Sequence, residues 1–383
     1  MQPELYCEPS RPNTRSVRTL GTESAEPETV VDERVYHVSL RSGGTVADVA
    51  AQRVPETHMA NSTLTAVPGI KVGHHTLTAR PTGCTVVLVE GDGATGGISQ
   101  RGGSPGTRET DLLNPLNRVD KVNAVVLAGG SAFGLDAAAG AMRWLEDRRI
   151  GWDTRAGRIP IVPAAILYDL DVGDDPRVRP TAECGYLAAD SASAAPVGEG
   201  TVGAGAGATV GKFGGGQGMK GGIGSASFAL PNGLVVGAIA AVNAVGDIVD
   251  PKTGQIVAGS LTPDGTFLDV RRAIHAGTEM PPARPGENTT IVVVATNAKL
   301  SKSDTNWIAL MADDGIARAI YPSHTVSDGD TVFALATGQW DGASSATDIG
   351  ALAADAVAEA IVRAVTQATS VAGIPAARDR QHN

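Results

Sequence analysis

The sequence predicts a layered α+β fold, because continuous apolar runs alternate with segments of helical spacing. Runs at Thr85–Glu90, Asn123–Ala128 and Leu234–Val242 are typical of strands buried on both faces. Between Phe133 and Arg148, leucine and methionine recur among alanines at helical spacing. Strands of this kind need helices to cover them, so we expect helices layered on sheets.

The same alternation continues to the end of the chain. We expect a strand, a helix, a second strand and a second helix, in that order, at Ile291–Ala295, Asp304–Ile320, Thr331–Ala336 and Asp348–Ala368. Gly373 and Pro375 follow the last helix, where glycine closes a helix and proline cannot continue it.

The composition describes an acidic chain that folds. Of 383 residues 42% are apolar, and 31 lysines and arginines against 41 aspartates and glutamates leave a net charge of -10. Such a chain has no electrostatic reason to bind nucleic acid. The longest apolar stretch, around Leu234–Val242, is shorter than the roughly 18 residues of a membrane span. We therefore expect neither a nucleic-acid nor a membrane partner.

Residues 1–58 differ from the rest of the chain. They are rich in charge and proline, as in Gly21–Thr29, and show little apolar periodicity. We expect a disordered N-terminal extension, 1–58, followed by a single domain, 59–383. Met59 opens the compact-looking part and is an alternative start of the natural chain.

Cysteines and histidines form no recognisable framework. Cys7, Cys84 and Cys184 are an odd number, far apart and without CxxC spacing, so they indicate neither disulfides nor zinc. The seven histidines include no HxxxH or HxH pair. No basic segment followed by an apolar run opens the chain. We expect no metal, no organic cofactor and a cytoplasmic location.

The glycine-rich segment Gly203–Phe213 has two open interpretations. A P-loop would need glycine where Ala206 stands and Ser or Thr where Phe213 stands. The weaker GxGxxA dinucleotide pattern is present, but further glycines follow where a helix should begin. The segment is therefore either a loop that allows close backbone packing or a catalytic loop that presents Lys212.

A strand, a glycine turn and a helix follow one another in Asn123–Leu135, in outline like a nucleophile elbow. The elbow pattern GxSxG would need glycine at Phe133. Ser131 is instead expected to cap the helix or to line a pocket at its N-terminus, where free N–H groups favour anions.

Two short motifs near the end of the chain carry chemistry. Asn288-Thr289-Thr290 opens a predicted strand, and Asp328-Gly329-Asp330 lies in a turn before the next. Asn288 can be a plain turn residue or an idle glycosylation sequon, and the second motif a plain turn. Alternatively, a threonine freed by backbone cleavage has a hydroxyl nucleophile and its own amine as base.

Several motifs in order give the chain a resemblance. They are Val67–Gly73, Gly102–Thr107, Leu127–Gly134, Pro163–Asp169, Gly203–Lys212, Val242–Asn243, Asn288–Thr290 and Asp328–Asp330. In these residues the chain resembles the L-aminopeptidase/D-Ala-esterase family, self-cleaving hydrolases of the N-terminal-nucleophile type. That family includes β-peptidyl aminopeptidases and endo-type nylon-oligomer hydrolases. The chain looks closest to the nylon-oligomer branch, which shares the Asn-Thr junction and the Asp-x-Asp turn.

The resemblance implies a four-layer αββα sandwich and self-cleavage between Asn288 and Thr289. The products, 1–288 and 289–383, would stay associated, and the cleaved protomers would form a homo-oligomer, frequently a tetramer. The family's catalytic positions correspond here to Thr289, Lys212, Asn243, Asp328, Asp330 and Tyr168. Thr289 is then the nucleophile, Asn243 and Tyr168 stabilise the oxyanion, and the lysine and aspartates position and tune the nucleophile.

The predicted function is hydrolysis of amide bonds in small peptides or peptide-like oligoamides. An aminopeptidase that releases N-terminal amino acids is one alternative. Family aminopeptidases often have serine and a Ser-x-Glu pair where this chain has Thr289 and Asp328-Gly329-Asp330, which argues against it. A second alternative is a non-catalytic, glycine-rich small-molecule-binding protein, although such a protein would be expected to have lost a catalytic residue.

Overall fold

The structure is a computed structural model of the chain. It describes residues 61–215, 217–278, 286–343 and 345–380, all of which belong to one compact unit, Thr57–Asn383. The predicted extension 1–58 and Met59 lie outside the described residues, as does most of the loop before the predicted cleavage site.

One sheet contains six strands in the order β12-β13-β16-β18-β3-β5. They span Gly222–Ala229 (β12), Val235–Asn243 (β13), Thr289–Ala298 (β16), Thr331–Trp340 (β18), Ala94–Gln100 (β3) and Lys121–Val122 (β5). Only β16 and β18 are parallel neighbours in this sheet. Because β13 runs opposite to both, its last residues lie at the same edge as their first residues.

The second sheet contains five strands in the order β1-β2-β6-β9-β4. They span Ile70–Thr76 (β1), Gly83–Val89 (β2), Ala124–Ala128 (β6), Ala164–Ile166 (β9) and Thr107–Arg108 (β4). Here β6 and β9 are parallel, and the other neighbours are antiparallel.

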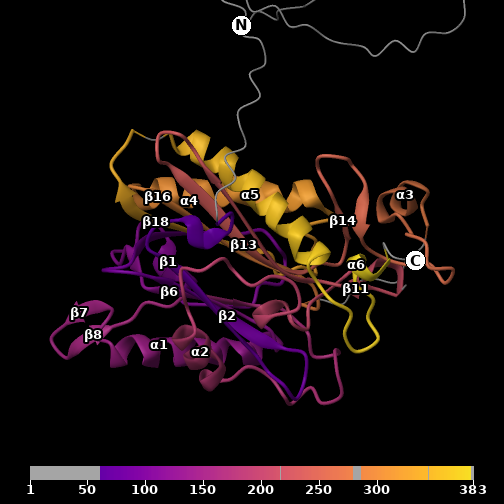
Figure 1. The fold of residues 1–383 in the computed structure, drawn as a ribbon, viewed down its shortest axis with the longest axis horizontal. Coiled ribbons are helices and arrows are strands. Elements are labelled where there is room, and N and C mark those ends of the chain that lie inside the picture. Colours follow the sequence, from indigo (N-terminus) through magenta and orange to yellow (C-terminus); the bar gives the residue numbers. More distant parts are fainter. Residues whose placement is uncertain (1–60, 216, 279–285, 344, 381–383) are drawn as a thin grey trace, which may run out of the picture. The chain divides into compact units, whose positions relative to one another are not determined.

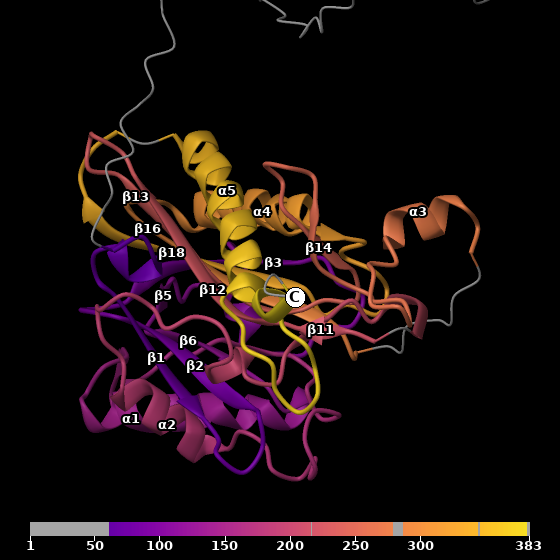
Figure 2. The same cartoon turned by 45° about the vertical axis from the view of Figure 1, so that its right-hand side comes forward.

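Helices cover the outer faces of both sheets (Figures 1 and 2). On the six-stranded sheet lie α4 (Lys302–Ala319) and α5 (Ala346–Thr366), while α1 (Ala137–Asp147) and α2 (Ala182–Asp190) cover the five-stranded sheet. Both α4 and α5 begin after a serine whose side chain accepts a main-chain N–H of the first turn, which is a common helix cap.

Three apolar cores separate the layers. Along β13, Ala238, Ala240 and Val242 pack toward α4 and α5, whereas Ile239 and Ala241 pack between the two sheets. The same alternation in β2 and β6 divides their residues between the central core and the core under α1 and α2. The order of layers is therefore helix, sheet, sheet, helix, which confirms the expected αββα sandwich.

Smaller elements complete the description. They are β7 (Trp152–Thr154) with β8 (Gly157–Ile159), β10 (Thr209–Val210) with β11 (Met219–Lys220), the sheet of β15 (Ile256–Ala258), β14 (Asp247–Val249) and β17 (Ile320–Tyr321), and helices α3 (Val270–His275) and α6 (Ala377–Arg380). Turns of 3-10 helix span Leu64–Ala66, Thr110–Leu113, Ser131–Asp136, Gly203–Gly205 and Phe213–Gly215. None of the described helices has the length and apolar character needed to cross a membrane.

Every helix and strand expected from apolar spacing is present, with shifted ends. Those not expected include β1, β3, β12 and α2. Most residues of β12 are glycine, alanine or serine, because α5 packs directly on this strand. A Cβ at Gly224 would lie 2.0 Å from the main-chain oxygen of Ala360. A pattern that depends on large apolar residues cannot detect such a strand.

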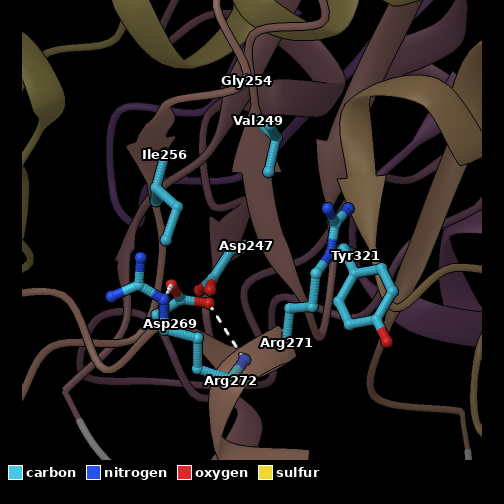
Figure 3. Close-up of a pocket in the computed structure, with 8 residues that line it drawn as sticks. All are labelled: Asp247, Val249, Gly254, Ile256, Asp269, Arg271, Arg272 and Tyr321. Atoms are coloured by element: carbon cyan, nitrogen blue, oxygen red, sulfur yellow. Dashed lines mark hydrogen bonds and ion pairs between the residues drawn. The ribbon is translucent and has the colours of Figure 1, made fainter. Parts of the chain in front are cut away.

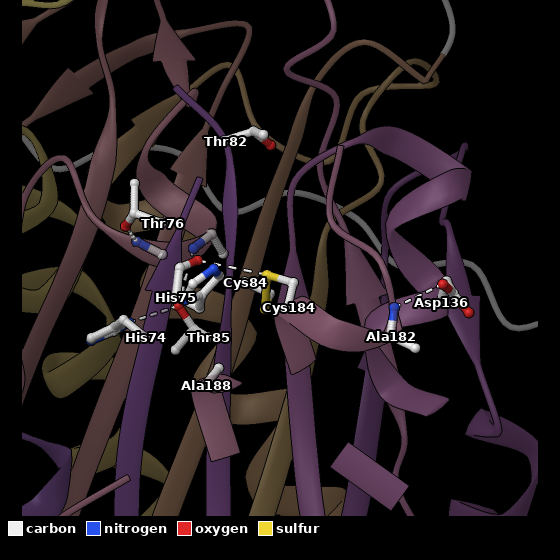
Figure 4. The surroundings of a disulfide bond; sticks show 12 residues. His74, His75, Thr76, Thr82, Cys84, Thr85, Asp136, Ala182, Cys184 and Ala188 are labelled. Atoms are coloured by element: carbon white, nitrogen blue, oxygen red, sulfur yellow. Dashed lines mark hydrogen bonds between the residues drawn. A yellow bond between two sulfur atoms is a disulfide. The ribbon is translucent and has the colours of Figure 1, made fainter. Parts of the chain in front are cut away.

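The structure corrects the expectation that the cysteines indicate no disulfide. Cys84 on β2 and Cys184 on α2 form a disulfide across 100 residues of chain (Figure 4). Both are buried in the core between the five-stranded sheet and its helices. The spacing rule failed because tertiary contact between β2 and α2, and not a short sequence spacing, brings the two sulfurs together. The argument from cysteines for a reducing compartment is thereby removed.

Candidate active site

The end of β13 and the beginnings of β16 and β18 meet at one edge of the six-stranded sheet. Asn243, the last residue of β13, lies opposite Thr289, the first residue of β16. The turn with Asp328 and Asp330 comes directly before β18, and Asn288 forms a β-bridge with Asp328. All five residues are at most 3% exposed. Strand order thus brings together residues that are far apart in the chain.

Several hydrogen bonds hold the side chain of Asn243. Its side-chain oxygen accepts from the main-chain N–H of Thr209 at 2.9 Å and from Lys212 Nζ at 3.0 Å. Its side-chain nitrogen donates to the main-chain oxygens of Tyr168 at 2.9 Å and Glu287 at 3.2 Å. These contacts fix the orientation of the amide, so that its N–H₂ group faces the segment that precedes Thr289.

Lys212 presents its ammonium group to the same place. Besides the Asn243 side chain, Nζ donates to the main-chain oxygens of Asn243 and Glu287, both at 3.1 Å. Burial lowers the pKa of Lys212 to about 7, although the carboxylates of Asp328 and Glu287 act in the opposite direction. A lysine of this kind can exchange a proton near neutral pH.

The two aspartates have different surroundings. Asp330 accepts the main-chain N–H of Thr290 at 2.7 Å on one oxygen and that of His324 at 3.1 Å on the other. Asp328 accepts only the N–H of Thr325, at 2.7 Å, and its second oxygen is buried without a hydrogen-bond partner among the described residues. Burial, followed by the charge of Asp330, raises the pKa of Asp328 to about 6. The pair can therefore hold one proton in weakly acidic solution.

The loop that begins Gly102-Gly103-Ser104 supports the acidic turn. Ser104 donates its main-chain N–H to the main-chain oxygen of Asp328 at 2.8 Å. Arg101 donates its main-chain N–H to the main-chain oxygen of Asp330 at 3.3 Å. A Cβ at Gly102 would lie 2.3 Å from the main-chain oxygen of Asp328. The glycine is required because the two backbones are in direct contact.

The main-chain oxygen of Asn288, at the predicted scissile bond, accepts two hydrogen bonds. It accepts the main-chain N–H of Gly329 at 2.8 Å. The hydroxyl of Thr289 donates to the same oxygen. The Gly329 N–H polarises the carbonyl, and the potential nucleophile lies next to it.

Tyr168 meets the site through its main-chain oxygen, while its hydroxyl donates to Asp171 at 2.9 Å. The adjacent Asp169 forms a fully buried ion pair with Arg80 at 2.8 Å and also accepts from the Thr82 hydroxyl. Buried pairs with further hydrogen bonds fix geometry, so Asp169 anchors the segment that carries Tyr168.

A cavity of about 80 Å³ adjoins these residues. Its lining consists of Tyr168, Asp169, Asp171, Val172, Thr209, Lys212 and Glu287. It is small, and apart from the lysine its ionised groups are acidic.

A larger hollow of about 210 Å³ lies elsewhere (Figure 3). Its lining residues are Asp247, Val249, Gly254, Ile256, Asp269, Arg271, Arg272 and Tyr321. Asp247 accepts two main-chain N–H groups, Arg272 pairs with Asp269 at 3.0 Å, and Arg271 stacks on the Tyr321 ring. Because each charged side chain has an internal partner, this hollow is a weaker candidate.

The glycine-rich loop is unsuited to phosphate. Lys220, fully buried, donates to the main-chain oxygens of Gly205, Ala208 and Gly221 at 2.7 to 2.9 Å. The main-chain oxygens of the loop thus point toward the Lys220 ammonium group, whereas a phosphate site needs main-chain N–H groups. The loop packs closely, as the first interpretation expects, and it also brings Lys212 to the site.

Ser131 does not cap a helix as expected. It begins a 3-10 helix whose capping residue is Gly130, and its own N–H donates to the oxygen of Leu167. That N–H is therefore not available to an anion.

Sequence reasoning missed His324, Asp313, Arg80 and Asp169. The sequence pattern could have indicated Asp313. It lies one turn after Ala309 on the buried face of α4, where an isolated charged residue is unusual. The other three lie in loops. Asp169 ends the Pro163–Asp169 motif, but nothing in the sequence predicts the contacts that the three residues make.

Solved structures share this fold. A β-aminopeptidase from Burkholderia sp. has a TM-score of 0.61 and 22% identity, with 82% of this chain and 90% of that chain covered. The L-aminopeptidase D-Ala-esterase/amidase from Ochrobactrum anthropi, described as a variant of the Ntn hydrolase fold, has a TM-score of 0.58 and 22% identity over 80% and 86%. The four layers therefore define a protein of the N-terminal-nucleophile hydrolase fold.

The chain belongs to peptidase family S58, whose model matches residues 62–378. An uncharacterized aminopeptidase of Mycobacterium leprae is 45% identical over 82% of this chain and 92% of its own length. A 6-aminohexanoate-oligomer endohydrolase of Kocuria sp. is 30% identical over 78% and 84%. The protein is accordingly a hydrolase of the peptidase and amidase kind. The mycobacterial protein is more similar to this chain than the nylon-oligomer hydrolase is.

Proposed function

We propose that the protein cleaves its own chain after Asn288 and then hydrolyses amide bonds with Thr289 as an N-terminal nucleophile. One observation carries the proposal: the oxygen of Asn288 accepts the Gly329 N–H at 2.8 Å and also the Thr289 hydroxyl. A carbonyl polarised next to a hydroxyl is the arrangement that an N-to-O acyl shift needs.

In self-cleavage, the Thr289 oxygen attacks the Asn288 carbonyl carbon and gives up its proton. The bond from that carbon to the Thr289 nitrogen breaks, and the nitrogen takes up the proton, which leaves an ester on the Thr289 oxygen. Water then hydrolyses the ester to a carboxylate at Asn288 and a free hydroxyl and amine at Thr289. We assign this proton transfer to Asp328, a buried carboxyl with a raised pKa in the turn that bridges to Asn288.

The same steps serve an external amide. The Thr289 hydroxyl attacks the substrate carbonyl while the α-amine, with a reference pKa of about 7.7 to 8.0, accepts its proton. The amine leaving group takes the proton, and water hydrolyses the acyl-enzyme ester. Asp330 holds the neighbouring Thr290 N–H and so orients the start of β16.

Cleavage also frees two donors. In the uncut chain, both the Asn243 side-chain nitrogen and Lys212 Nζ bond to the Glu287 oxygen. Once the chain is cut, displacement of this segment makes both groups available to the developing oxyanion of a substrate. The Tyr168 hydroxyl donates to Asp171 in the uncut chain and would have to turn away from that carboxylate to join them.

The cavity favours one substrate class, peptides with a free amino terminus. Asp171 lines it, and a carboxylate pairs with a substrate ammonium group. The mycobacterial relatives, which are named aminopeptidases, agree with this choice. The endohydrolase activity named for the Kocuria relative is the competing candidate, because such a cut requires no free amine.

Matched substrates separate the candidates. Amino-acid p-nitroanilides and β-peptides should be hydrolysed, whereas their N-acetylated forms should not. Equal rates on both forms, together with cleavage of 6-aminohexanoate oligomers, would favour internal cuts. Binding without turnover of any amide would support the non-catalytic alternative.

The cleaved protomers are expected to form a homo-oligomer, for which the family resemblance implies four copies. Light scattering during size-exclusion chromatography measures this directly. A cytoplasmic location stays a prediction that now lacks its argument from cysteines.

A further inference from the structure

The side chains of Asp330, His324 and Asp313 form a row that begins in the acidic turn. His324 Nδ1 lies 3.0 Å from an Asp330 oxygen, and its Nε2 lies 3.6 Å from an Asp313 oxygen. The exposed fractions of these side chains are 16% for His324, 4% for Asp330 and 0% for Asp313. An imidazole is thus enclosed between two carboxyl groups, and neither the fold nor the proposed steps explain why.

The row runs from the nucleophile toward the surface. At its inner end, Asp330 accepts the N–H of Thr290, the residue after Thr289. At its outer end, Asp313 Oδ2 accepts the Ser99 hydroxyl at 2.6 Å. The same oxygen lies 3.8 Å from Arg101 Nε, and the Arg101 side chain is 45% exposed. Groups from β3, α4 and the turn before β18 therefore converge on one imidazole.

The ring nitrogens of His324 face these two carboxyl groups without a hydrogen bond among the described residues. Its backbone has a φ of 55°, a left-handed conformation that residues other than glycine seldom adopt. In the part of the chain that the structure describes, no three His, Cys, Asp or Glu side chains are arranged to hold a metal ion. A charge and proton network is the interpretation that fits the row.

The acidic turn needs two cations. Asp328 and Asp330 flank Gly329 in a buried turn, where two carboxylates do not ionise together unless opposite charges are near. The charge of Lys212 acts on Asp328. His324 is the cation within 4 Å of Asp330 among the described ion pairs.

The electrostatics of His324 agree with this assignment. Burial lowers its pKa, but contact with Asp330, and then the charges of Asp330 and Asp313, outweigh burial and the opposing charge of Arg101, so that the net pKa is raised. Burial raises the pKa of Asp313 to about 6, against the effects of Ser99 and His324. The imidazole is therefore more readily charged than a free histidine.

We propose that His324, held between Asp313 and Asp330, is a positioning residue that supplies the positive charge beside Asp330 while Asp328 takes up and releases a proton. The proposal rests on the function proposed above for Thr289. It assigns a task to two residues outside every motif of the sequence.

The first test is the pH dependence of self-cleavage and of hydrolysis in His324→Gln. Glutamine keeps the size and polarity but cannot carry a charge. The acidic limb of the pH–rate profile should move upward by about one to three units, the usual effect of an opposite charge at this distance. The rate at the alkaline plateau should be retained. His275→Gln, on exposed α3, is the matched control and should leave the profile unchanged.

The second test follows the imidazole directly by NMR in the Thr289→Ala protein, where turnover plays no part. The His324 signal should titrate above the ordinary histidine range, and Asp313→Asn should lower its midpoint. Asp314→Asn removes a charge one residue away, from a side chain that is 58% exposed, and should change little.

An unmoved acidic limb in a folded His324→Gln protein would overturn the proposal. So would a His324 titration that is indifferent to Asp313→Asn, a result that does not depend on whether the glutamine variant folds. A wild-type protein that neither cuts itself nor hydrolyses amides would instead contradict the proposed function, and the NMR titration would still decide whether His324 is charged by this row.

Discussion

Lys212 Nζ lies 3.0 Å from the side-chain oxygen and 3.1 Å from the main-chain oxygen of Asn243. One ammonium group thereby joins the glycine-rich loop to the end of β13, directly opposite Thr289. The two residues that would stabilise the oxyanion are thus held as a unit. A change to either is expected to disturb the other, so their effects on turnover should not be additive.

Self-cleavage is the first expected outcome. Mass spectrometry of the purified protein should show a fragment that begins at Thr289. Thr289→Ala should abolish both this fragment and amide hydrolysis, because no hydroxyl remains for the acyl shift. Thr290→Ala, which removes the next hydroxyl, should still be cut at the same bond. Only full-length chain after long incubation, or a new N-terminus elsewhere, would contradict the assignment.

Lys212→Ala and Asp330→Asn should each lower turnover of a simple amide by roughly a hundredfold or more, the usual scale for a positioned proton-transfer group. Because Lys212 touches only oxygens near the site, its loss should leave the far-ultraviolet circular dichroism spectrum unchanged. Lys252→Ala provides a control at an exposed position. Near-normal rates in both variants, with Thr289 processed, would show that other residues form the catalytic centre.

The buried pair of Arg80 and Asp169 should be important for stability. Arg80→Met leaves the Asp169 carboxylate buried without its cation, which is expected to lower the free energy of unfolding by about 3 to 5 kcal/mol. Arg318→Met removes a pair with Asp355 that is about half exposed, and should cost less than about 1 kcal/mol. Urea denaturation of both variants measures the difference. Similar losses would show that burial of the first pair has no special effect.

Thiol counting tests the disulfide. Denatured protein should have one reactive thiol of its three cysteines before reduction and three after it. Closing a loop of about 100 residues restricts the unfolded chain by up to about 4.7 kcal/mol, so reduction should lower the melting temperature markedly. Cys7→Ser, which leaves the pair intact, should melt like the wild type. Three reactive thiols without reduction would contradict the bond.

How far the sequence predicts this structure depends on the kind of interaction. Strands such as β13 and β16 were predictable because long apolar runs determine burial locally. The Asn288-Thr289 junction and the Asp328-Gly329-Asp330 turn are contiguous motifs, and strand order then brings them together. The row of Asp313, His324 and Asp330 and the pair of Cys84 and Cys184 were not predictable, because each joins segments whose proximity exists only in the folded chain.

Deletion of residues 1–58 should leave folding and self-cleavage intact. The family match begins at residue 62, and the first core residue described is Leu64, which is fully buried together with Val67 between the two sheets. A protein that starts at Met59 keeps both side chains, whereas one that starts at Gly69 loses them. The shorter protein should be destabilised by several kcal/mol, since burial of one such side chain contributes about 1.5 to 3 kcal/mol. Thermal melting and the mass of the Thr289 fragment should therefore be unchanged for the first protein and altered for the second. Aggregation or failed cleavage of the protein that starts at Met59 would show that the N-terminal segment is part of the folded structure.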